Sequence, residues 1–188
     1  MNFSKLPLEI DKLPNIFVFV EIPMDSKVKY EIDEKTGFLM ADRFLFTAMK
    51  FPFNYGFIPN SVGEDNDPLD VLLLASETVS AGTVVKAKII GMLEMKDEAG
   101  IDTKLIAVPI KKIDPLYGEY DDVEDIPVAV KDKIKHFFDH YKELEPGKWV
   151  KTERFLNRDK AVSLVKKLSY FYLRKNYVPK DNSKRYHS

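Results

Sequence analysis

Three aspartates fall within six residues, Asp65, Asp67 and Asp70, and an apolar run from Val71 to Ala75 follows directly. An unpaired carboxylate at the start of a buried strand is costly, and a divalent cation would offset both that cost and the mutual repulsion. The pattern does not fit an EF-hand, because loop position 6 would be Asp70 instead of Gly and position 12 would be a serine. An acidic, hydrated turn explains the triplet alone about as well.

A second pair of carboxylates, Asp97 and Asp102, flanks a turn at Gly100. Asp102 and Lys104 are two residues apart, so they share a face if a strand begins there. Taken alone, a charged turn is the better interpretation. Together with the first triplet, the two groups offer hard oxygen ligands without His or Cys, which favours Mg²⁺ or Mn²⁺ over zinc.

A third group is cationic or hydroxylic. Its members are Lys29, Arg43, Tyr55, Tyr141 and Lys142. Lys29 shares a predicted strand face with Glu31, so a surface ion pair contributing under ~1 kcal/mol is the simpler explanation for that part. A cationic rim beside metal-binding carboxylates would instead bind phosphate.

His136 and His140 have the i, i+4 spacing of helical metal ligands. The stretch "HFFDH" lacks the glutamate of H-E-x-x-H, so a zinc protease fits poorly. An ordinary helix face is favoured, with a subunit interface as one use of that face. Trp149, the only tryptophan, is predicted to lie in the core.

Composition narrows the class of protein. The 188 residues are 45% hydrophobic and contain no cysteine, which allows a sizeable core and excludes disulfides, thiolate nucleophiles and cysteine zinc sites. The 29 basic residues balance 30 acidic ones, which argues against nucleic acid as the main partner. No apolar stretch approaches the ~18–20 residues of a membrane span, so we expect no membrane association and a cytoplasmic location.

Short strands with turn signals dominate the first two-thirds of the chain and predict a small barrel. The expected strands are Asn15–Pro23, Val28–Asp33, Phe38–Phe46, Val71–Ala75, Thr83–Met95 with a bulge at Gly91, and Lys104–Ile110. The segment Phe51–Asp67 has no regular period and is predicted to be a long ordered loop.

The last third has helical spacing. One helix is expected from Val130 to Leu144, ended by Glu145–Gly147, and a second over Ala161–Phe171. We expect one domain over residues 1–173 and a polar, mobile tail over 174–188.

These pieces occur together, in this order, in one known family. The stretches "VEIP", "KYEID", "ADRFL", "FPFNYGFIP", "EDNDPLDVL", "MKDEAGIDTKLIAVP" and "HFFDHYKELEPGKWV" resemble the soluble inorganic pyrophosphatases of family I, especially the bacterial members, over Leu13–Trp149. The resemblance implies an α+β protein, mainly β with flanking helices: a five-stranded OB-like closed barrel with helices packed outside. It also implies a homohexamer.

The resemblance further implies a role for each site residue in hydrolysing the Mg²⁺ complex of pyrophosphate. Several Mg²⁺ ions would serve each site, with Mn²⁺ as a substitute, and a metal-activated water would attack directly with Asp67 as the base. The implied metal ligands are Asp65, Asp70, Asp97 and Asp102, with Glu21 and Glu31 in an outer acidic shell. The implied pyrophosphate-binding residues are Lys29, Arg43, Tyr55, Lys104, Tyr141 and Lys142.

Two positions depart from the family pattern. Asn66 stands where many bacterial members have glycine, and Phe51 stands where a tyrosine is usual, which removes one hydroxyl. The alternative function is a non-enzymatic OB-fold module that binds single-stranded nucleic acid on its aromatics and lysines. It leaves the five aspartates unexplained, because they would repel the phosphate backbone. A metal buffer, which would bind metal without turnover, is a third hypothesis.

Overall fold

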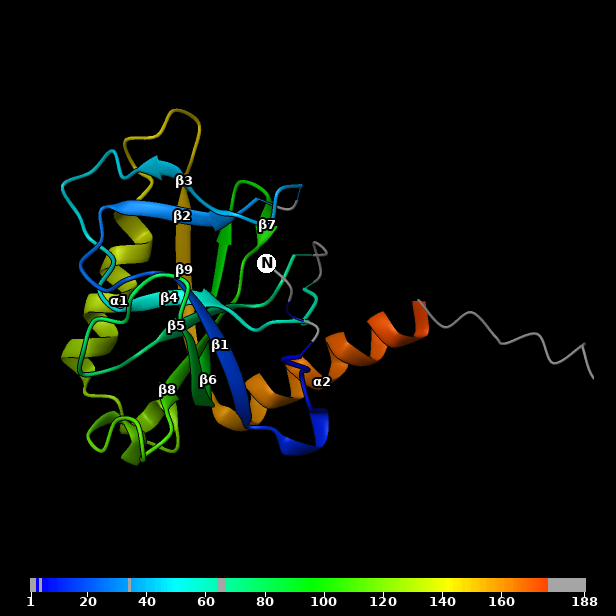
Figure 1. Ribbon diagram of the computed structural model, residues 1–188. Coiled ribbons are helices and arrows are strands. Elements are labelled where there is room, and N and C mark those ends of the chain that lie inside the picture. Colours follow the sequence, from blue (N-terminus) through cyan, green and yellow to red (C-terminus); the bar gives the residue numbers. More distant parts are fainter. Residues whose placement is uncertain (1–2, 4, 34, 64–66, 176–188) are drawn as a thin grey trace, which may run out of the picture.

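Five strands close into a ring in the computed structural model, which describes residues 3, 5–33, 35–63 and 67–175 (Figure 1). The order around the ring is β1 (Asn15–Ile22), β4 (Asn54–Phe57), β5 (Asp70–Leu73), β8 (Lys104–Pro109) and β6 (Val84–Asp97), which pairs again with β1. The β5–β8 pairing is parallel and the others are antiparallel. The predicted five-stranded barrel is confirmed.

Of the remaining strands, two pair with β6 and two form a separate sheet. β7 (Gly100–Ile101) and β9 (Val150–Asn157) both pair with β6. β2 (Val28–Ile32) and β3 (Leu39–Phe44) form an antiparallel hairpin, as predicted, with Lys29 opposite Arg43. This hairpin is a two-stranded sheet of its own and lies above the ring in Figure 1.

Both predicted helices are present with shifted bounds, and three short 3-10 turns accompany them. The helices are α1 (Val128–His140) and α2 (Arg158–Lys175), and the turns are Ile10–Lys12, Tyr117–Glu119 and Val123–Asp125. α1 ends four residues before the predicted Leu144, and turns follow it. α2 ends at Lys175, two residues beyond residue 173, where we expect the domain to end. The expected mobile tail from 176 onward lies outside the described residues. No helix in the described part of the chain combines the length and apolar character of a membrane span.

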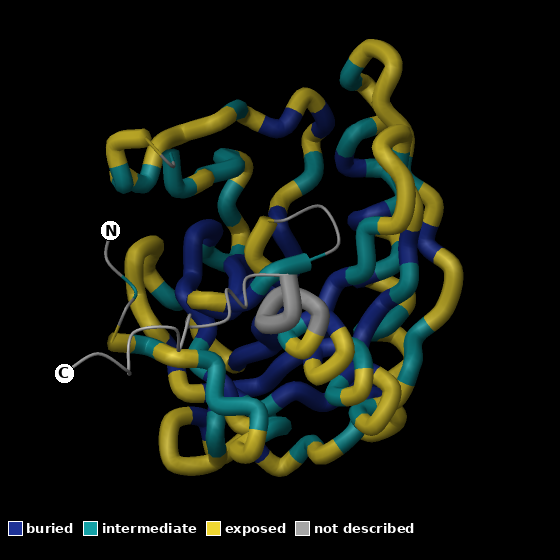
Figure 2. The backbone as a smooth tube through the Cα atoms, turned by 90° about the vertical axis from the view of Figure 1, so that its right-hand side faces the viewer, coloured by how far each residue is buried: buried dark blue, intermediate teal, exposed yellow. Residues whose placement is uncertain are grey.

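Two apolar clusters bury both faces of the central strands, and buried residues are dark blue in Figure 2. Leu72 and Leu74 face a cluster that contains Phe137 of α1, whereas the intervening Val71 and Leu73 face a cluster that contains Ala161, Val165 and Leu168 of α2. A strand buried on both faces has no reason to alternate in polarity. This accounts for the continuous apolar run after Asp70.

The structure corrects two of the sequence predictions and confirms a third. The segment Phe51–Asp67 is not irregular throughout, because it contains β4, whose four residues are all buried and therefore show no alternation. Trp149 is 49% exposed, so its predicted core location is wrong. The bulge at Gly91 is confirmed, since the β6–β8 register shifts there and a Cβ would come within 2.7 Å of the Leu156 carbonyl oxygen.

Candidate active site

Lys104 lies at the centre of the acidic side of the site. It opens β8, beside the parallel strand β5 that begins at Asp70, so the fold places the two side chains together. Its Nζ lies 2.5 Å from both Asp70 Oδ2 and Asp102 Oδ1, and its side chain is only 6% exposed. The same Nζ lies 5.8 Å from the ring centroid of Tyr55 on β4. Carboxylates from two parts of the chain therefore converge on one cation.

A second carboxylate–lysine pair lies at the end of β6. Asp97 Oδ2 accepts a hydrogen bond from Lys142 Nζ at 2.9 Å, and both side chains are mostly buried. Lys142 follows the end of α1, where the early termination of the helix places Tyr141 and Lys142 in a turn. Lys142 Nζ lies 5.7 Å from the Tyr141 ring centroid.

The hairpin β2–β3 carries the remaining cations. Lys29 pairs with Glu31 on its own strand and lies 3.4 Å from Asp42. Arg43 donates from Nη1 to Asp42 Oδ2 at 2.6 Å and from Nε to Glu145 Oε1 at 3.0 Å. These charges form one network along the hairpin.

Glu21 connects the hairpin with the barrel. It is a buried residue of β1, and its Oε1 accepts the backbone N–H of Ile32 at 3.0 Å. Burial raises the pKa of Glu21 to about 7, and the negative charges of Asp70 and Glu31 act in the same direction. The charges of Asp70 on the barrel and Glu31 on the hairpin thus both act on Glu21.

Charges from both the barrel and the hairpin act on Tyr141. Burial is the main cause that raises the pKa of Tyr141 far above its ordinary value, and the charges of Lys104, Asp102, Arg43 and Asp70 all act on the same hydroxyl. Burial also raises the pKa of Tyr55, so both tyrosines stay protonated near neutral pH and can donate hydrogen bonds.

Burial and charge oppose each other at two further groups. Burial alone would lower the pKa of Lys104, but the charges of Asp70, Tyr55 and Asp102 raise it well above its ordinary value. Burial alone would raise the pKa of Asp97, but its hydrogen bonds from Lys142 and the Ala99 backbone lower it. The Lys104 ammonium and the Asp97 carboxylate are therefore both charged near neutral pH.

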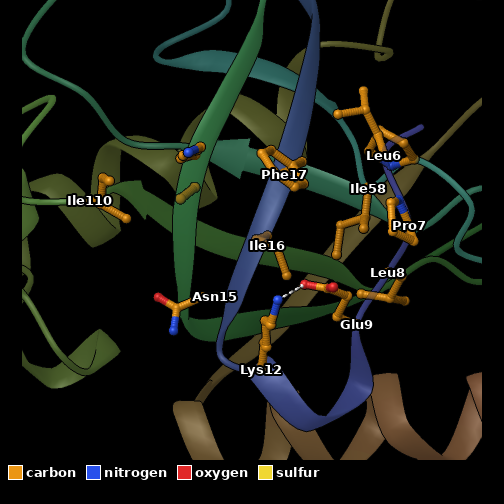
Figure 3. A pocket seen from close by; sticks show the side chains of 13 residues that line it. Leu6, Pro7, Leu8, Glu9, Lys12, Asn15, Ile16, Phe17, Ile58 and Ile110 are labelled. Atoms are coloured by element: carbon orange, nitrogen blue, oxygen red, sulfur yellow. Dashed lines mark ion pairs between the residues drawn. The ribbon is translucent and has the colours of Figure 1, made fainter.

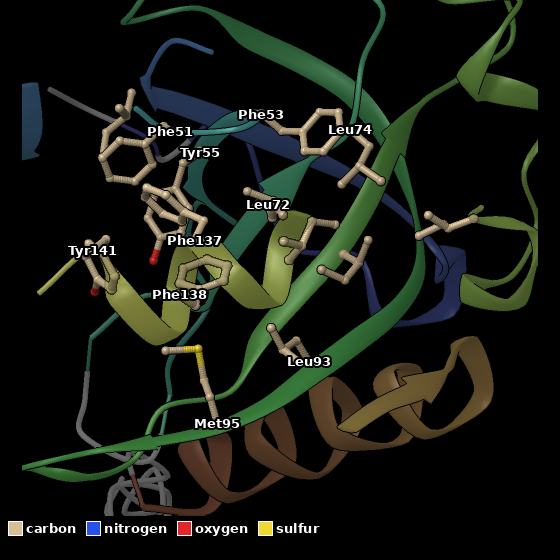
Figure 4. Close-up of a cluster of buried hydrophobic side chains, with 14 of the residues drawn as sticks. Phe51, Phe53, Tyr55, Leu72, Leu74, Leu93, Met95, Phe137, Phe138 and Tyr141 are labelled. Carbon is tan, nitrogen blue, oxygen red and sulfur yellow. The ribbon is translucent and has the colours of Figure 1, made fainter. Parts of the chain in front are cut away.

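An aromatic wall, made of Phe51, Tyr55, Phe137 and Tyr141, lies beside these groups. Phe51 lies 5.7 Å from Tyr55 and 4.9 Å from Phe137 between ring centroids, and Phe137 stacks on Tyr141 at 5.0 Å (Figure 4). Phe51 is itself buried. The residue that departs from the family pattern therefore packs directly against the two tyrosines of the site.

Two predicted site residues, Asp67 and Glu31, are not part of the buried ion pairs described above, and a third, Asp65, lies outside the described residues. Asp67 is exposed, and its backbone carbonyl accepts the N–H of Gly63 at 2.7 Å, which joins the two ends of the loop. Glu31 is half exposed and contacts Lys29. Among residues 3, 5–33, 35–63 and 67–175, no three His, Asp or Glu side chains gather closely enough to hold a metal ion by themselves.

Other charged groups belong elsewhere or were not expected. The rings of His136 and His140 lie 4.7 Å apart, and His140 pairs with Glu143 at 2.9 Å on an exposed helix end. Asp42 and Glu145, which hold Arg43, were not predicted from the sequence. Asp42 could have been suggested by its position next to Arg43, but no local signal marks Glu145.

A cavity of about 300 Å³ lies away from this site, between the N-terminal segment and β1 (Figure 3). Its walls include Leu8, Ile16 and Ile58, and an ion pair between Glu9 and Lys12 lies beside it. None of the predicted site residues lines it. The charged constellation, and not this apolar cavity, is therefore the candidate active site.

Comparison with known proteins gives one consistent family. The family model described as inorganic pyrophosphatase matches residues 18–172. The inorganic pyrophosphatase of Aquifex pyrophilus is 52% identical over 167 residues, which cover 89% of this chain and 94% of that protein.

Solved structures agree with the sequence comparison. The Helicobacter pylori inorganic pyrophosphatase superposes with a TM-score of 0.84 at 46% identity, covering 90% of this chain and 99% of that one. The Thermus thermophilus enzyme gives 0.86 at 37% identity, covering 92% and 99%. With this fold, this charged site and these relatives, the chain belongs to the inorganic pyrophosphatase family of enzymes.

Proposed function

We propose that the protein hydrolyses inorganic pyrophosphate to two phosphates in a Mg²⁺-dependent reaction, by direct in-line attack of water and without a covalent enzyme intermediate. The carrying observation is that carboxylates and cations converge on one site, as Asp70, Asp102 and Lys104 do. Carboxylates alone would repel a polyphosphate, whereas carboxylates that hold metal ions beside free cations would bind it. The choice of pyrophosphate as the substrate rests on the relatives, which are named inorganic pyrophosphatases.

The donor set suits a hard divalent cation. Asp70 and Asp102 already share one positive group, Lys104 Nζ, and Asp65 would add a third carboxylate from the same loop. Asp97 would bind metal that arrives with the substrate, and Glu21 and Glu31 would form an outer acidic shell. Bound Mg²⁺ would lower the pKa of water and neutralise phosphate charge. All ligands are oxygens, as Mg²⁺ prefers.

The two lysines would change partners during the cycle. If Asp70, Asp102 and Asp97 were to hold metal, Lys104 and Lys142 would leave the carboxylates that they contact here. Their ammonium groups would then be available to the pyrophosphate, together with Lys29 and Arg43. An exchange of ion pairs in this form would couple metal binding to substrate binding.

The chemical step moves one proton and breaks one bond. Asp67 accepts a proton from water while the water oxygen attacks one phosphorus, and the bridging P–O bond breaks so that the second phosphate leaves with the electron pair. Arg43 and Lys142 stabilise charge on the leaving phosphate, and the hydroxyls of Tyr55 and Tyr141 donate hydrogen bonds. Most of the catalysis is thus electrostatic positioning.

Phosphate release from pyrophosphate tests this function directly. We expect turnover with Mg²⁺, weaker or altered turnover with Mn²⁺, and loss of turnover with EDTA that added Mg²⁺ restores. Absence of phosphate release together with tight oligonucleotide binding would support the nucleic-acid module, and metal binding without turnover would support the metal buffer. Sizing chromatography in the same buffers tests the expected homohexamer. The cytoplasmic location stays a prediction.

A further inference from the structure

Two glutamates connect the hairpin β2–β3, which is a separate sheet, to other parts of the molecule. Glu21 on β1 accepts the N–H of Ile32 at one end of β2. Glu145, which follows α1, accepts the Nε–H of Arg43 on β3 at 3.0 Å. The second link joins residues 102 positions apart and ends on a proposed substrate-binding group.

The backbone around Glu145 is fixed by its own turns. The Glu145 N–H donates to the Lys142 carbonyl at 2.8 Å, and the Glu145 carbonyl accepts the Lys148 N–H at 3.1 Å. The Glu145 side chain is 10% exposed and that of Arg43 is 23% exposed. An ion pair this far withdrawn from water is less screened than a surface pair.

The two carboxylates that hold Arg43 leave part of its fork available. Glu145 takes Nε and Asp42 takes Nη1, and neither of these bonds uses Nη2. Guanidinium nitrogens lie in one plane, so fixing two of them sets the direction of the third. Unlike the partners of Lys104 and Lys142, neither carboxylate is among the proposed metal ligands, so these bonds need not break when metal binds.

We propose that Glu145 is a positioning residue for the reaction: it sets the direction of the Arg43 guanidinium and holds the hairpin at a fixed distance from the barrel side of the site. This inference rests on the proposed function. A pyrophosphate that reaches from Lys142 to Arg43 requires both sides at the correct separation, and a misplacement of about 1 Å can cost about 100-fold in rate.

Replacing Glu145 tests this role. We expect Glu145→Met, which keeps the volume but removes the acceptor, to lower kcat/KM for Mg²⁺-pyrophosphate about tenfold, a loss well inside that limit. Glu145→Gln keeps an oxygen for the Nε–H and should retain more activity. The control is Glu94→Met, which removes another Arg–Glu pair, Arg154–Glu94 at 2.8 Å, that is more exposed and includes no proposed site residue; it should leave kcat/KM unchanged.

A double-mutant cycle separates positioning from general structural support. Arg43→Lys removes the fork, so adding Glu145→Met to it should cost less than about twofold more. An equal loss in both backgrounds would overturn the inference, as would wild-type kcat/KM in folded Glu145→Met. If Glu145→Met fails to fold, Glu145→Gln decides through the same cycle. Wild-type protein without phosphate release would instead refute the proposed function itself.

Discussion

Asp70, Asp97 and Asp102 lie on or beside strands of the closed ring, whereas Lys29, Glu31 and Arg43 lie on a hairpin that forms its own sheet. Asp70 and Lys104 begin adjacent parallel strands, so the ring itself sets their separation. Arg43 is placed instead by side-chain partners, Asp42 and Glu145. One side of the site is thus built by backbone hydrogen bonds and the other by ion pairs.

This difference predicts separate roles for the two sides of the site. The barrel side presents carboxylates at set positions, which suits metal ions with strict coordination geometry. The hairpin side presents long cationic side chains, which suits a substrate that must enter and leave. Damage to the barrel side should therefore affect chemistry and stability, and damage to the hairpin side should mainly affect substrate positioning.

The largest expected effect is on the loop between β4 and β5. Asp67→Asn removes the proposed proton acceptor while keeping the size of the side chain, so we expect kcat to fall by at least about 100-fold, as for loss of a general base. Mg²⁺ binding, measured by titration calorimetry, should remain. Near-wild-type turnover in this variant would show that Asp67 is not the base.

Removal of Lys104 should lower stability, apart from any effect on the proposed pyrophosphate binding. Lys104→Met leaves Asp70 and Asp102 facing each other with side chains 34% and 25% exposed, so we take the lower end, about 3 kcal/mol, of the cost of breaking a buried pair. We expect a loss of this size in the free energy of unfolding by urea in EDTA, and a smaller loss in Mg²⁺, because a bound cation replaces the ammonium.

The control for Lys104 is Lys88→Met, which removes an ion pair to the exposed Asp121. That variant should lose under about 1 kcal/mol. Equal losses in both variants, or no recovery of Lys104→Met with Mg²⁺, would contradict the view that Lys104 and the metal share the same carboxylates.

The second carboxylate–lysine pair tests the exchange of partners without any turnover. Lys142→Met frees Asp97, so we expect Mg²⁺ affinity in the absence of substrate to rise about tenfold by calorimetry. Lys148→Met removes the same charge nearby but frees Glu98 instead, and should change affinity by less than about twofold. Similar Mg²⁺ affinities for the two variants would mean that the overall charge of the protein, and not the release of Asp97, sets the affinity.

The smallest expected effect concerns the aromatic wall. Phe51→Tyr adds a hydroxyl beside Tyr55 and Tyr141, and we expect a modest gain in kcat/KM, within about fivefold, measured by phosphate release. The thermal midpoint serves as the control for packing, because Phe51 is buried. An unchanged rate with an unchanged midpoint would show that this hydroxyl is dispensable.

Much of this architecture can be predicted from local sequence. The alternation in Val28–Ile32 predicts the strand β2, although none of its residues is buried. The helical spacing of Ile134, Phe137 and Phe138 predicts α1 and also its buried face. β4 could not be predicted in this way, because four residues buried on both faces carry no period. Trp149 likewise lies exposed in the connection between α1 and β9, whereas its residue type alone predicts the core.

The candidate site divides along the same line. The aspartates and Lys104 occur in short motifs, so their grouping was expected before the fold was known. The contact between Arg43 and Glu145 joins distant segments, and only the packing of the turn after α1 against the hairpin brings them together. Contacts that depend on tertiary packing leave no mark on the sequence near either partner.

The most direct test of this account is a crystal structure with Mn²⁺ and phosphate bound, in which anomalous scattering locates the metal. We predict metal coordinated by Asp70 and Asp102, Lys104 Nζ moved off both carboxylates, and phosphate bound by Arg43 and Lys142. Metal only at a remote place such as His136 and His140, with Lys104 still between the two aspartates, would contradict it.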